Sequence, residues 1–397
     1  MTVNTVGVTN IVAKDRILKV LTLGHAVAVS EQHLEWERKT KGRNLKIVLL
    51  GAGPLAKKIL STQLRYLIQA IADNDHNVQG SEIDGFTVIS PDQAIQRFGL
   101  DACFVVTIYN GSVPADKLRA AGCTMVIPFP IFFRYYAEEL LPHVSLQASS
   151  PLFTEASEIL LTLDLWADEE SKSEFTSQIE FHGSPNYKHL PRMRNPAMTY
   201  FDSDLFELTG DDKFVDCGAF DGDVIKMFLS RIPAFEGIII AFEPDKSNAK
   251  ALADYVAGLS SELGARILIQ PFALGNVREI RSFTEQGTVG SGFSSGGEGV
   301  DVQVVRLDEV LVGFSPTLIK MDIEGAEIEA LQGGRETIAR DKPILAICTY
   351  HHISDLWRIP QLIHDILPEY SLYLRRYAED CWETVCYAIP PQCEVTR

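Results

Sequence analysis

FVDCGAFDG, residues 214–222, is the stretch around which the second half of the chain can be placed. An apolar run ends in Asp216, and glycines at 218 and 222 frame a tight turn before an amphipathic segment that starts at Val224. A strand, a glycine turn and a helix in this order are typical of the first unit of a nucleotide-binding α/β domain. We therefore expect such a domain over residues 200–397.

The spacing D-x-G-x-x-x-G places the carboxylate of Asp216 at the end of the strand. A pyrophosphate would be repelled there, whereas the positive amino and sulfonium end of S-adenosylmethionine would be attracted. Gly218 would let this cofactor approach the backbone, and Gly222 would let the helix pack close to the strand. The spacing is equally compatible with an ordinary strand, turn and helix, so its interpretation depends on the motifs that follow.

The residues after the second and third predicted strands complete the expected nucleoside site. The run GIIIAF at 237–242 is followed by Glu243, about 20 residues beyond the glycine turn, where a carboxylate can accept hydrogen bonds from both ribose hydroxyls. The alternative for Glu243 is an ordinary acid at a strand end. Residues 267–269 form the third expected strand, and we assign Ala273 and Leu274 after it to the flanks of an adenine ring.

The segment GTVGSGFSSGGEG, residues 287–299, is rich in glycine and serine and has no hydrophobic periodicity. Its composition predicts a loop. A lid that orders on substrate and a flexible surface loop are both compatible with it.

Three carboxylates follow the fourth predicted strand, PTLIKMDI at residues 316–323. Asp322 ends this strand, and Glu324 and Glu327 open the next helix. Carboxylates are costly to cluster without cationic or hydrogen-bonding partners, and Lys320 inside the apolar strand could be one such partner. Ligands bind at this edge of doubly wound sheets. Acids in a first helical turn also suit the helix dipole, which would explain both glutamates but not Asp322.

Two histidines follow the fifth predicted strand, ILAICTY at residues 344–350. His351 or His352 could take up a proton at this edge near neutral pH, or both could be turn and capping residues. We favour His351 as a general base. A helix expected from residue 355 and two alternating runs between 370 and 389 then complete the domain, the runs forming an antiparallel hairpin.

The first half of the chain carries a weaker version of the same pattern. Apolar residues 45–50 lead into Gly51-Ala52-Gly53-Pro54, and a strand over 67–72 ends in Asp73, where a ribose-binding acid would lie. We expect a small Rossmann-like domain over 41–130, with further strands at 86–89, 102–108 and 125–127. It could hold a nucleotide or a nucleotide sugar, or serve only packing or dimerisation, since Pro54 removes one N–H group from the turn.

Helical patterns flank this small domain on both sides. Residues 1–40 predict one or two peripheral helices, and residues 131–199 predict a helical bridge that enters the second domain at Tyr200-Phe201. The acidic run at 164–174 within the bridge is interpreted as a solvated helix face.

Composition limits the classes of function. The chain has 397 residues, of which 46% are apolar and 22% charged, as in globular proteins. Its formal charge of −17 argues against duplex nucleic acid as a partner, because phosphate binding needs a basic face. We find no secretory signal, no membrane-spanning run and no C-x-x-C pair among seven cysteines, and therefore expect a cytoplasmic protein without a disulfide frame or zinc knuckle.

Four ordered motifs make residues 200–390 resemble the FkbM-type methyltransferase family. They are VDCGAFDG at 215–222, FEP at 242–244, IKMDIEGAE at 319–327, and TYHH with DLWRIP between 349 and 360. The resemblance implies a seven-stranded Rossmann-like sheet with an antiparallel C-terminal hairpin, and S-adenosylmethionine as the methyl donor. It also implies a hydroxyl acceptor on a sugar, a glycan or a secondary metabolite. The small first domain lies outside the family's core.

The resemblance implies cofactor contacts at Asp216, Gly218, Gly222 and Glu243, and acidic active-site residues at Asp322 and Glu324. From the residues themselves we further hypothesise their roles. Asp322 and Glu324 would orient the acceptor or hold a divalent cation, although no dedicated metal-ligand spacing is visible. His351 would be the base that an alcohol needs during methyl transfer. The predicted cofactor contacts are Asp216, Gly218, Phe220, Gly222, Glu243, Pro244, Ala273 and Leu274.

Two other functions stay open from the sequence. One is an NAD(P)-binding or nucleotide-sugar-binding protein that acts through residues 51–73, and the other is a scaffold that binds a cofactor without turnover. A homodimer formed through the small domain is a further expectation.

Overall fold

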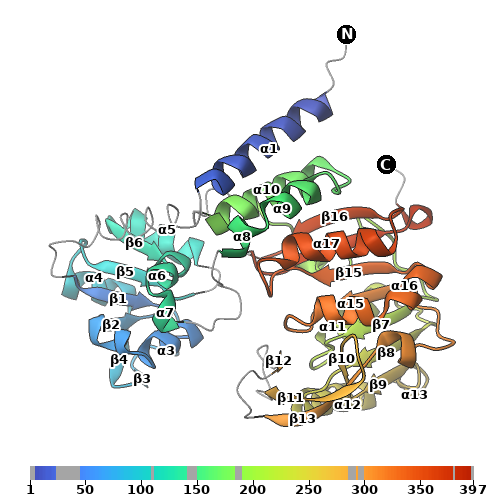
Figure 1. The fold of residues 1–397 in the computed structure, drawn as a ribbon. Coiled ribbons are helices and arrows are strands. Elements are labelled where there is room, and N and C mark those ends of the chain that lie inside the picture. The colour runs from blue at the N-terminus through green and yellow to red at the C-terminus, as the bar shows by residue number, and fades with distance from the viewer. Residues whose placement is uncertain are drawn as a thin grey trace.

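A computed structural model describes residues 5–23, 45–108, 111–140, 150–183, 190–284, 292–293, 299–378 and 381–394. Figure 1 shows two α/β bodies, a smaller one from the first half of the chain and a larger one from the second half. The predicted residues 24–40 of the N-terminal helices and residues 287–291 and 294–298 of the glycine-rich segment lie outside the described residues. In the described part, no helix is both long and apolar enough to cross a membrane.

The smaller body is a six-stranded sheet with strand order β3-β4-β2-β1-β5-β6, in which only β3 pairs antiparallel. Its strands match the predicted ones except for the short added β3. The strands are β1 (Ile47–Leu50), β2 (Ile68–Ala72), β3 (Glu82–Ile83), β4 (Phe86–Ile89), β5 (Cys103–Val106) and β6 (Met125–Pro128). The helices are α3 (Pro54–Leu60), η1 (Gln63–Leu67), α4 (Pro91–Phe98), α5 (Ser112–Ala120), α6 (Phe129–Tyr135) and α7 (Ala137–Leu140).

The larger body contains a seven-stranded sheet with strand order β16-β17-β15-β14-β7-β8-β9. Its strands are parallel except at the C-terminal hairpin, so the predicted fold class is confirmed. The strands are β7 (Lys213–Cys217), β8 (Ile238–Phe242), β9 (Ile267–Gln270), β14 (Leu318–Met321), β15 (Ile344–Cys348), β16 (Ser371–Arg376) and β17 (Thr384–Ile389).

Alternate residues of these strands enter two cores, one on each face of the sheet. Phe214 packs on the face that α11 (Asp223–Arg231) covers, and Val215 packs on the opposite face with α17 (Asp355–Ile366). The remaining helices of this body are α12 (Lys246–Ala257), α13 (Ser261–Gly264), α14 (Leu307–Val310), α15 (Glu327–Gly333), α16 (Arg335–Asp341), η3 (Pro196–Met198) and η4 (Pro391–Cys393).

A second sheet in the larger body was not predicted. It has the order β10-β13-β11-β12 and consists of β10 (Ala273–Leu274), β11 (Glu279–Thr284), β12 (Gly292–Phe293) and β13 (Val300–Val305). The alternation of apolar and polar residues in β13 is the signal for it in the sequence. This sheet adjoins the third strand of the main sheet, so it places the residues expected to flank the adenine ring.

The helices between the two bodies do not act as a separate bridge. The buried residues of α6 and α7 belong to the core of the smaller body. The helices α8 (Ser150–Thr154), α9 (Ala156–Leu163) and α10 (Glu169–Gly183) share a core with the larger body. The first helix, α1 (Thr5–Leu23), packs on α10, with ion pairs from Lys14 to Asp164 and from Arg16 to Glu180 (Figure 1). Packing thus divides the predicted bridge between the two bodies.

Candidate active site

A cavity of about 530 Å³ opens at the carboxyl edge of the seven-stranded sheet. The residues directly after β7, β8, β14 and β15 contribute to it, as expected where parallel strands end together. Its walls include Thr199, Tyr200, Gly218, Phe220, Asp223, Met227, Phe242, Glu243, Pro244, Asn248, Phe272, Ala273, Leu274, Phe283, Lys320, Asp322, Ile323, Glu324, Ala326, Tyr350, Trp382 and Glu383.

The turn after β7 needs its first glycine. Gly218 has φ +83°, and a Cβ there would lie 1.9 Å from the backbone oxygen of Asp322. Gly218 therefore lets β7 and β14 end side by side while its own backbone faces the cavity. Gly222 has φ +86° and packs on Leu252 and Tyr255 of α12, so it shapes the turn without lining the cavity.

Asp216 lies beneath this turn, and the prediction that it faces the cofactor directly is corrected. Its side chain is fully buried, is absent from the cavity wall, and forms an ion pair with Lys320 at 3.0 Å (Nζ to Oδ1). Lys320 Nζ also donates to the backbone oxygen of Gly218 at 2.7 Å. Burial raises the pKa of Asp216 to about 6, and the ammonium of Lys320 opposes that rise. The ion pair of Asp216 and Lys320 thus stabilises the glycine turn through the bond to Gly218.

Glu243, predicted to bind the ribose, lines the cavity. Its Oε2 accepts from the backbone N–H of Phe220 at 2.9 Å, and its Oε1 accepts from that of Asp245 at 2.9 Å. These two bonds fix the carboxylate and leave each oxygen one lone pair for a ligand hydroxyl. Burial raises the pKa of Glu243, and the two backbone N–H groups oppose that effect.

The predicted adenine end of the cavity is apolar. Ala273 and Leu274 are buried in β10 and line the cavity together with Phe272 and Pro244. Phe220, with φ +47°, lines the wall between this end and the turn. All the predicted cofactor contacts except Asp216 and Gly222 therefore meet at one cavity.

Asp322 stands at the other end of the cavity, held by two tyrosines. Its Oδ2 accepts from the hydroxyl of Tyr200 at 2.7 Å, and its Oδ1 accepts from that of Tyr350 at 3.0 Å. Burial would raise the pKa of Asp322, but the positive charges of His351 and Lys320 outweigh burial and lower it. Asp322 is thus an ionised carboxylate with a fixed orientation.

Two further carboxylates line the same end. Glu324 has φ +55°, and burial together with the charges of Asp322 and Glu327 raises its pKa to about 8 despite His351. Glu383, in the connection between β16 and β17, has its pKa raised to about 7 by burial and by Asp322. Asp322, Glu324 and Glu383 have only Lys320 and His351 as positive neighbours among the described residues. These carboxylates would therefore stabilise a cationic group that enters the cavity.

His351, predicted to be the general base, lies behind this wall and does not line the cavity. Its Nδ1 lies 2.9 Å from Oε1 of Glu327, and its Nε2 lies 3.3 Å from Oδ1 of Asp322 and 3.7 Å from Oε2 of Glu324. Burial alone would lower the pKa of His351, but Glu327, Asp322 and Glu324 raise it to about 10. The surrounding carboxylates thus favour the protonated form of the ring, which opposes its use as a base near neutral pH.

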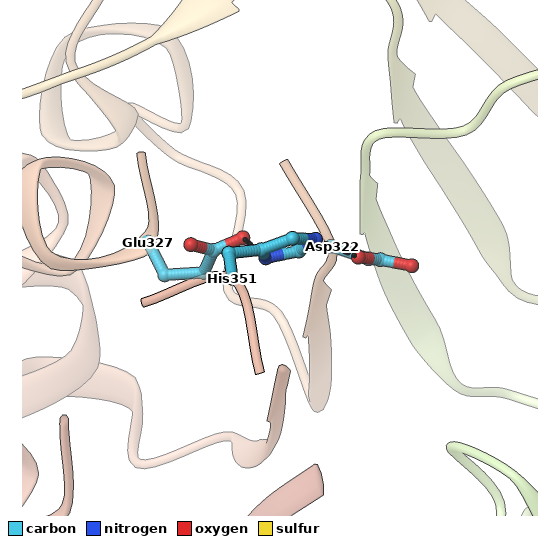
Figure 2. Close-up of side chains that lie close together, drawn as sticks. All are labelled: Asp322, Glu327 and His351. Carbon is cyan, nitrogen blue, oxygen red and sulfur yellow. Dashed lines mark ion pairs between the residues drawn. The ribbon is translucent and has the colours of Figure 1, made fainter. Parts of the chain in front are cut away.

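Figure 2 shows the ring of His351 between the carboxylates of Glu327 and Asp322. These three side chains offer ligand atoms within 4.8 Å of one another, which is a spacing that a metal ion could use. A histidine that binds a metal must be neutral, whereas this ring has a carboxylate oxygen near each nitrogen. The geometry therefore favours an ion-pair chain over a metal centre.

Sequence reasoning missed several residues of this end of the cavity. Tyr200 was predicted as the point where the chain enters the second domain, and its hydrogen bond to Asp322 was not predicted. Trp382, whose ring lies 5.4 Å from that of Tyr350, and Glu383 come from the hairpin connection. No local motif marks either residue, because only the closure of the sheet brings the hairpin next to β15.

The comparisons with known proteins agree with this geometry. Residues 216–377 match the family model of the methyltransferase FkbM domain. The crystal structure of methyltransferase FkbM from Methylobacillus flagellatus KT aligns with a TM-score of 0.75 and 21% identity, covering 96% of this chain and 100% of that chain. That likeness shows a shared fold over nearly the whole chain, the small domain included.

A precorrin-6y C5,15-methyltransferase from Geobacter metallireducens GS-15 aligns with a TM-score of only 0.30 and 14% identity, over 49% of this chain and 87% of that chain. This second likeness is too low to carry an argument. The search of curated proteins found no match. The family model covers the glycine turn, Glu243, the three carboxylates after β14 and His351. Residues 216–377 of this chain belong to the methyltransferase FkbM domain family.

Proposed function

We propose that this protein transfers the methyl group of S-adenosylmethionine to a hydroxyl oxygen of a small molecule or a glycan. The observation that carries the proposal is the cavity with two unlike ends. One end is apolar and has Glu243 fixed for a ribose, and the other is lined by Asp322, Glu324 and Glu383. A sulfonium nucleoside needs both, an apolar place for its base and negative charge near its cation.

Cofactor chemistry enters the mechanism in one way: bound S-adenosylmethionine supplies a methyl group on a positively charged sulfur. The residues of this chain would hold the acceptor oxygen in line with that methyl group, and a base among them would take up the hydroxyl proton as the oxygen is methylated. The protein's work is to hold the acceptor near attack distance and to exclude water.

We assign the proton transfer to Glu324. Its carboxylate lines the cavity, and a base with a pKa of about 8 is efficient near neutral pH. Asp322 would orient the acceptor hydroxyl, since both of its oxygens are already fixed by tyrosines. This proposal replaces His351 as the base and keeps Asp322 and Glu324 in the active site.

The charge of this end also limits the acceptor. Lys320 is the one basic side chain among the described residues of the cavity wall, and it forms an ion pair with Asp216. A phosphate or carboxylate near the reacting hydroxyl would face three acids, so we propose a neutral or amino-bearing acceptor. A cytoplasmic location and dimerisation through the small domain stay predictions from the sequence.

The test is transfer of labelled methyl from S-adenosylmethionine to a panel of neutral sugars, amino sugars, uronic acids, nucleotide sugars and simple alcohols. We expect label on an oxygen of a neutral or amino-bearing acceptor. Glu324→Gln should lower kcat by about 10²–10⁴-fold, as for loss of a general base. Binding of the donor without transfer to any of these or to a cell extract would favour the scaffold function instead.

A further inference from the structure

Glu327 is a buried acid that the proposed mechanism does not use. It is the first residue of α15, its side chain is fully buried, and its Oε1 accepts from the backbone N–H of Ile323 at 2.8 Å. The same oxygen lies 2.9 Å from Nδ1 of His351. A carboxylate is not buried in this way without partners, so these contacts define what Glu327 does.

The ring of His351 connects this buried acid to the cavity wall. It is 3% exposed, and its other nitrogen faces Asp322 and Glu324. Ionised carboxylates attract positive charge, and oxygens of three carboxylates lie 2.9 to 3.7 Å from the two ring nitrogens. This geometry favours an imidazolium, with one carboxylate behind it and two in front.

Other charged groups surround the row of side chains formed by Glu327, His351, Asp322 and Glu324. Some of them stabilise the charges of this row, and others oppose them. The positive side chain of Lys320 lies on β14, while the acids Glu383 and Asp355 come from the hairpin connection and from α17. The hydroxyls of Tyr200 and Tyr350 donate to Asp322. His352 lies near Glu327. Without the charge of His351, Asp322 and Glu324 would stand side by side with Lys320 as their nearest cation.

We propose that Glu327 is a positioning residue that keeps His351 in its charged form, and that this buried cation favours the ionised forms of Asp322 and Glu324 at the acceptor end of the cavity. This inference rests on the proposed function for its kinetic consequence only. Glu327 would touch neither donor nor acceptor, because it is absent from the cavity wall.

A purely structural role for Glu327 predicts different results. Its bond to Ile323 and its place in the first turn of a helix would stabilise α15 whatever the charge of His351. Glu327→Gln keeps an oxygen for Ile323 and removes the negative charge from His351. Glu329→Gln is the matched control, because Glu329 lies in the same helix but pairs with Arg281 at 2.9 Å, outside the chain of acids.

The first experiment needs no acceptor. The full-length protein is labelled with ¹³C and ¹⁵N histidine, and the His351 signals are identified by comparison with His351→Gln. We expect His351 to remain an imidazolium through pH 8 in the wild type and in Glu329→Gln, and to titrate at least about 2 pH units lower in Glu327→Gln. A neutral His351 ring at pH 8 in the wild type would overturn the inference even if no variant folds.

The second experiment is the pH dependence of kcat for methyl transfer. Loss of the cation should raise the pKa of Glu324, so in Glu327→Gln the acid limb of the profile moves about 1 unit to higher pH, with partial recovery of kcat at alkaline pH. An unmoved limb with a lower melting temperature would mean a structural role and refute the inference. A charged His351 in a protein that transfers no methyl would refute the proposed function alone.

Discussion

The two glycine turns of this molecule are built alike and differ in what lies beneath them. In both bodies the turn follows the first strand of the sheet along the chain, and an acid at the end of the next strand accepts from a turn N–H and from the N–H two residues further on. Asp73 does so with Ala52 and Asp75 at 2.8 and 2.9 Å, and Glu243 does so with Phe220 and Asp245. The same arrangement of a strand-end acid and two backbone N–H groups is thus present twice.

The charges beneath the two turns are not alike. Asp216 is two residues before Gly218 and pairs in register with Lys320 of the neighbouring strand. In the small domain, Leu49 is two residues before Gly51 and pairs in register with Val105. Both of those residues are fully buried and apolar. A glycine turn with an acid at the end of the next strand is therefore common to both α/β bodies of this molecule. The buried ion pair beneath the turn is found in the body that carries the candidate active site.

The largest expected effect is the loss of stability when the buried ion pair between Asp216 and Lys320 is broken. Lys320→Met leaves Asp216 as an uncompensated buried acid, which should lower the free energy of unfolding by about 3–5 kcal/mol. The double variant Asp216→Leu/Lys320→Val copies the apolar pair of the small domain and should recover most of that loss. Chemical denaturation monitored by fluorescence measures both. A double variant no more stable than Lys320→Met would show that the pair has another structural role.

The next largest effect separates the glycines of the two turns. Gly218→Ala places a Cβ against the backbone of Asp322 at a positive φ, and should cost about 2–5 kcal/mol through strain and overpacking. Gly53→Ala meets no atom within 4 Å and should change stability by less than about 0.5 kcal/mol. Thermal unfolding of the two variants checks this, and equal losses would contradict the strain expected at Gly218. Gly51, which matches Gly218 in position, is not the control, because it has φ +113° and a Cβ there would lie 2.5 Å from Ile108.

A smaller effect is expected from the two strand-end acids. Glu243→Gln weakens charge-assisted hydrogen bonds to ribose hydroxyls, each worth about 1.5–3 kcal/mol, so the Kd for S-adenosylmethionine should rise by about 10–150-fold. Asp73→Asn should leave that Kd unchanged. Calorimetric titration of the full chain with S-adenosylmethionine, NAD and NADP measures this. Binding of a dinucleotide that Asp73→Asn abolishes would establish a second site in the small domain.

The smallest effect is a pH dependence of donor binding. The pKa of Glu324 is raised to about 8, so below that pH most of this side chain carries a proton. A sulfonium favours the ionised form, and its binding should release a proton, so affinity for S-adenosylmethionine rises by up to about tenfold per pH unit from 6 to 8 and then levels off. S-adenosylhomocysteine lacks the cation and should show no such rise.

Calorimetry at pH 6, 7, 8 and 9 compares the two ligands. Glu324→Gln should flatten the curve for S-adenosylmethionine. If both ligands showed the same dependence on pH, Glu324 would not lie near the sulfonium.

The sequence predicted the backbone of this molecule better than its side-chain partners. Strands such as β7 and β15 are continuous apolar runs bounded by glycine or polar residues, and such runs are decided locally. The position of Asp216 beneath the turn depends on the register with Lys320, which no local pattern encodes. His351 was found by its place at the sheet edge. Its charge could not be predicted, because Glu327 and Asp322 reach it only once β14 and β15 lie side by side.

The first helix of the chain packs beside α9 and α10, on the larger body, while the small domain lies between them in sequence. The small domain is therefore tethered to the same neighbour at both of its ends. A module tethered once can swing freely about a single linker, whereas one tethered twice moves chiefly about the line joining its two attachment points. Any movement of the small domain relative to the larger body is therefore restrained at two points of the chain.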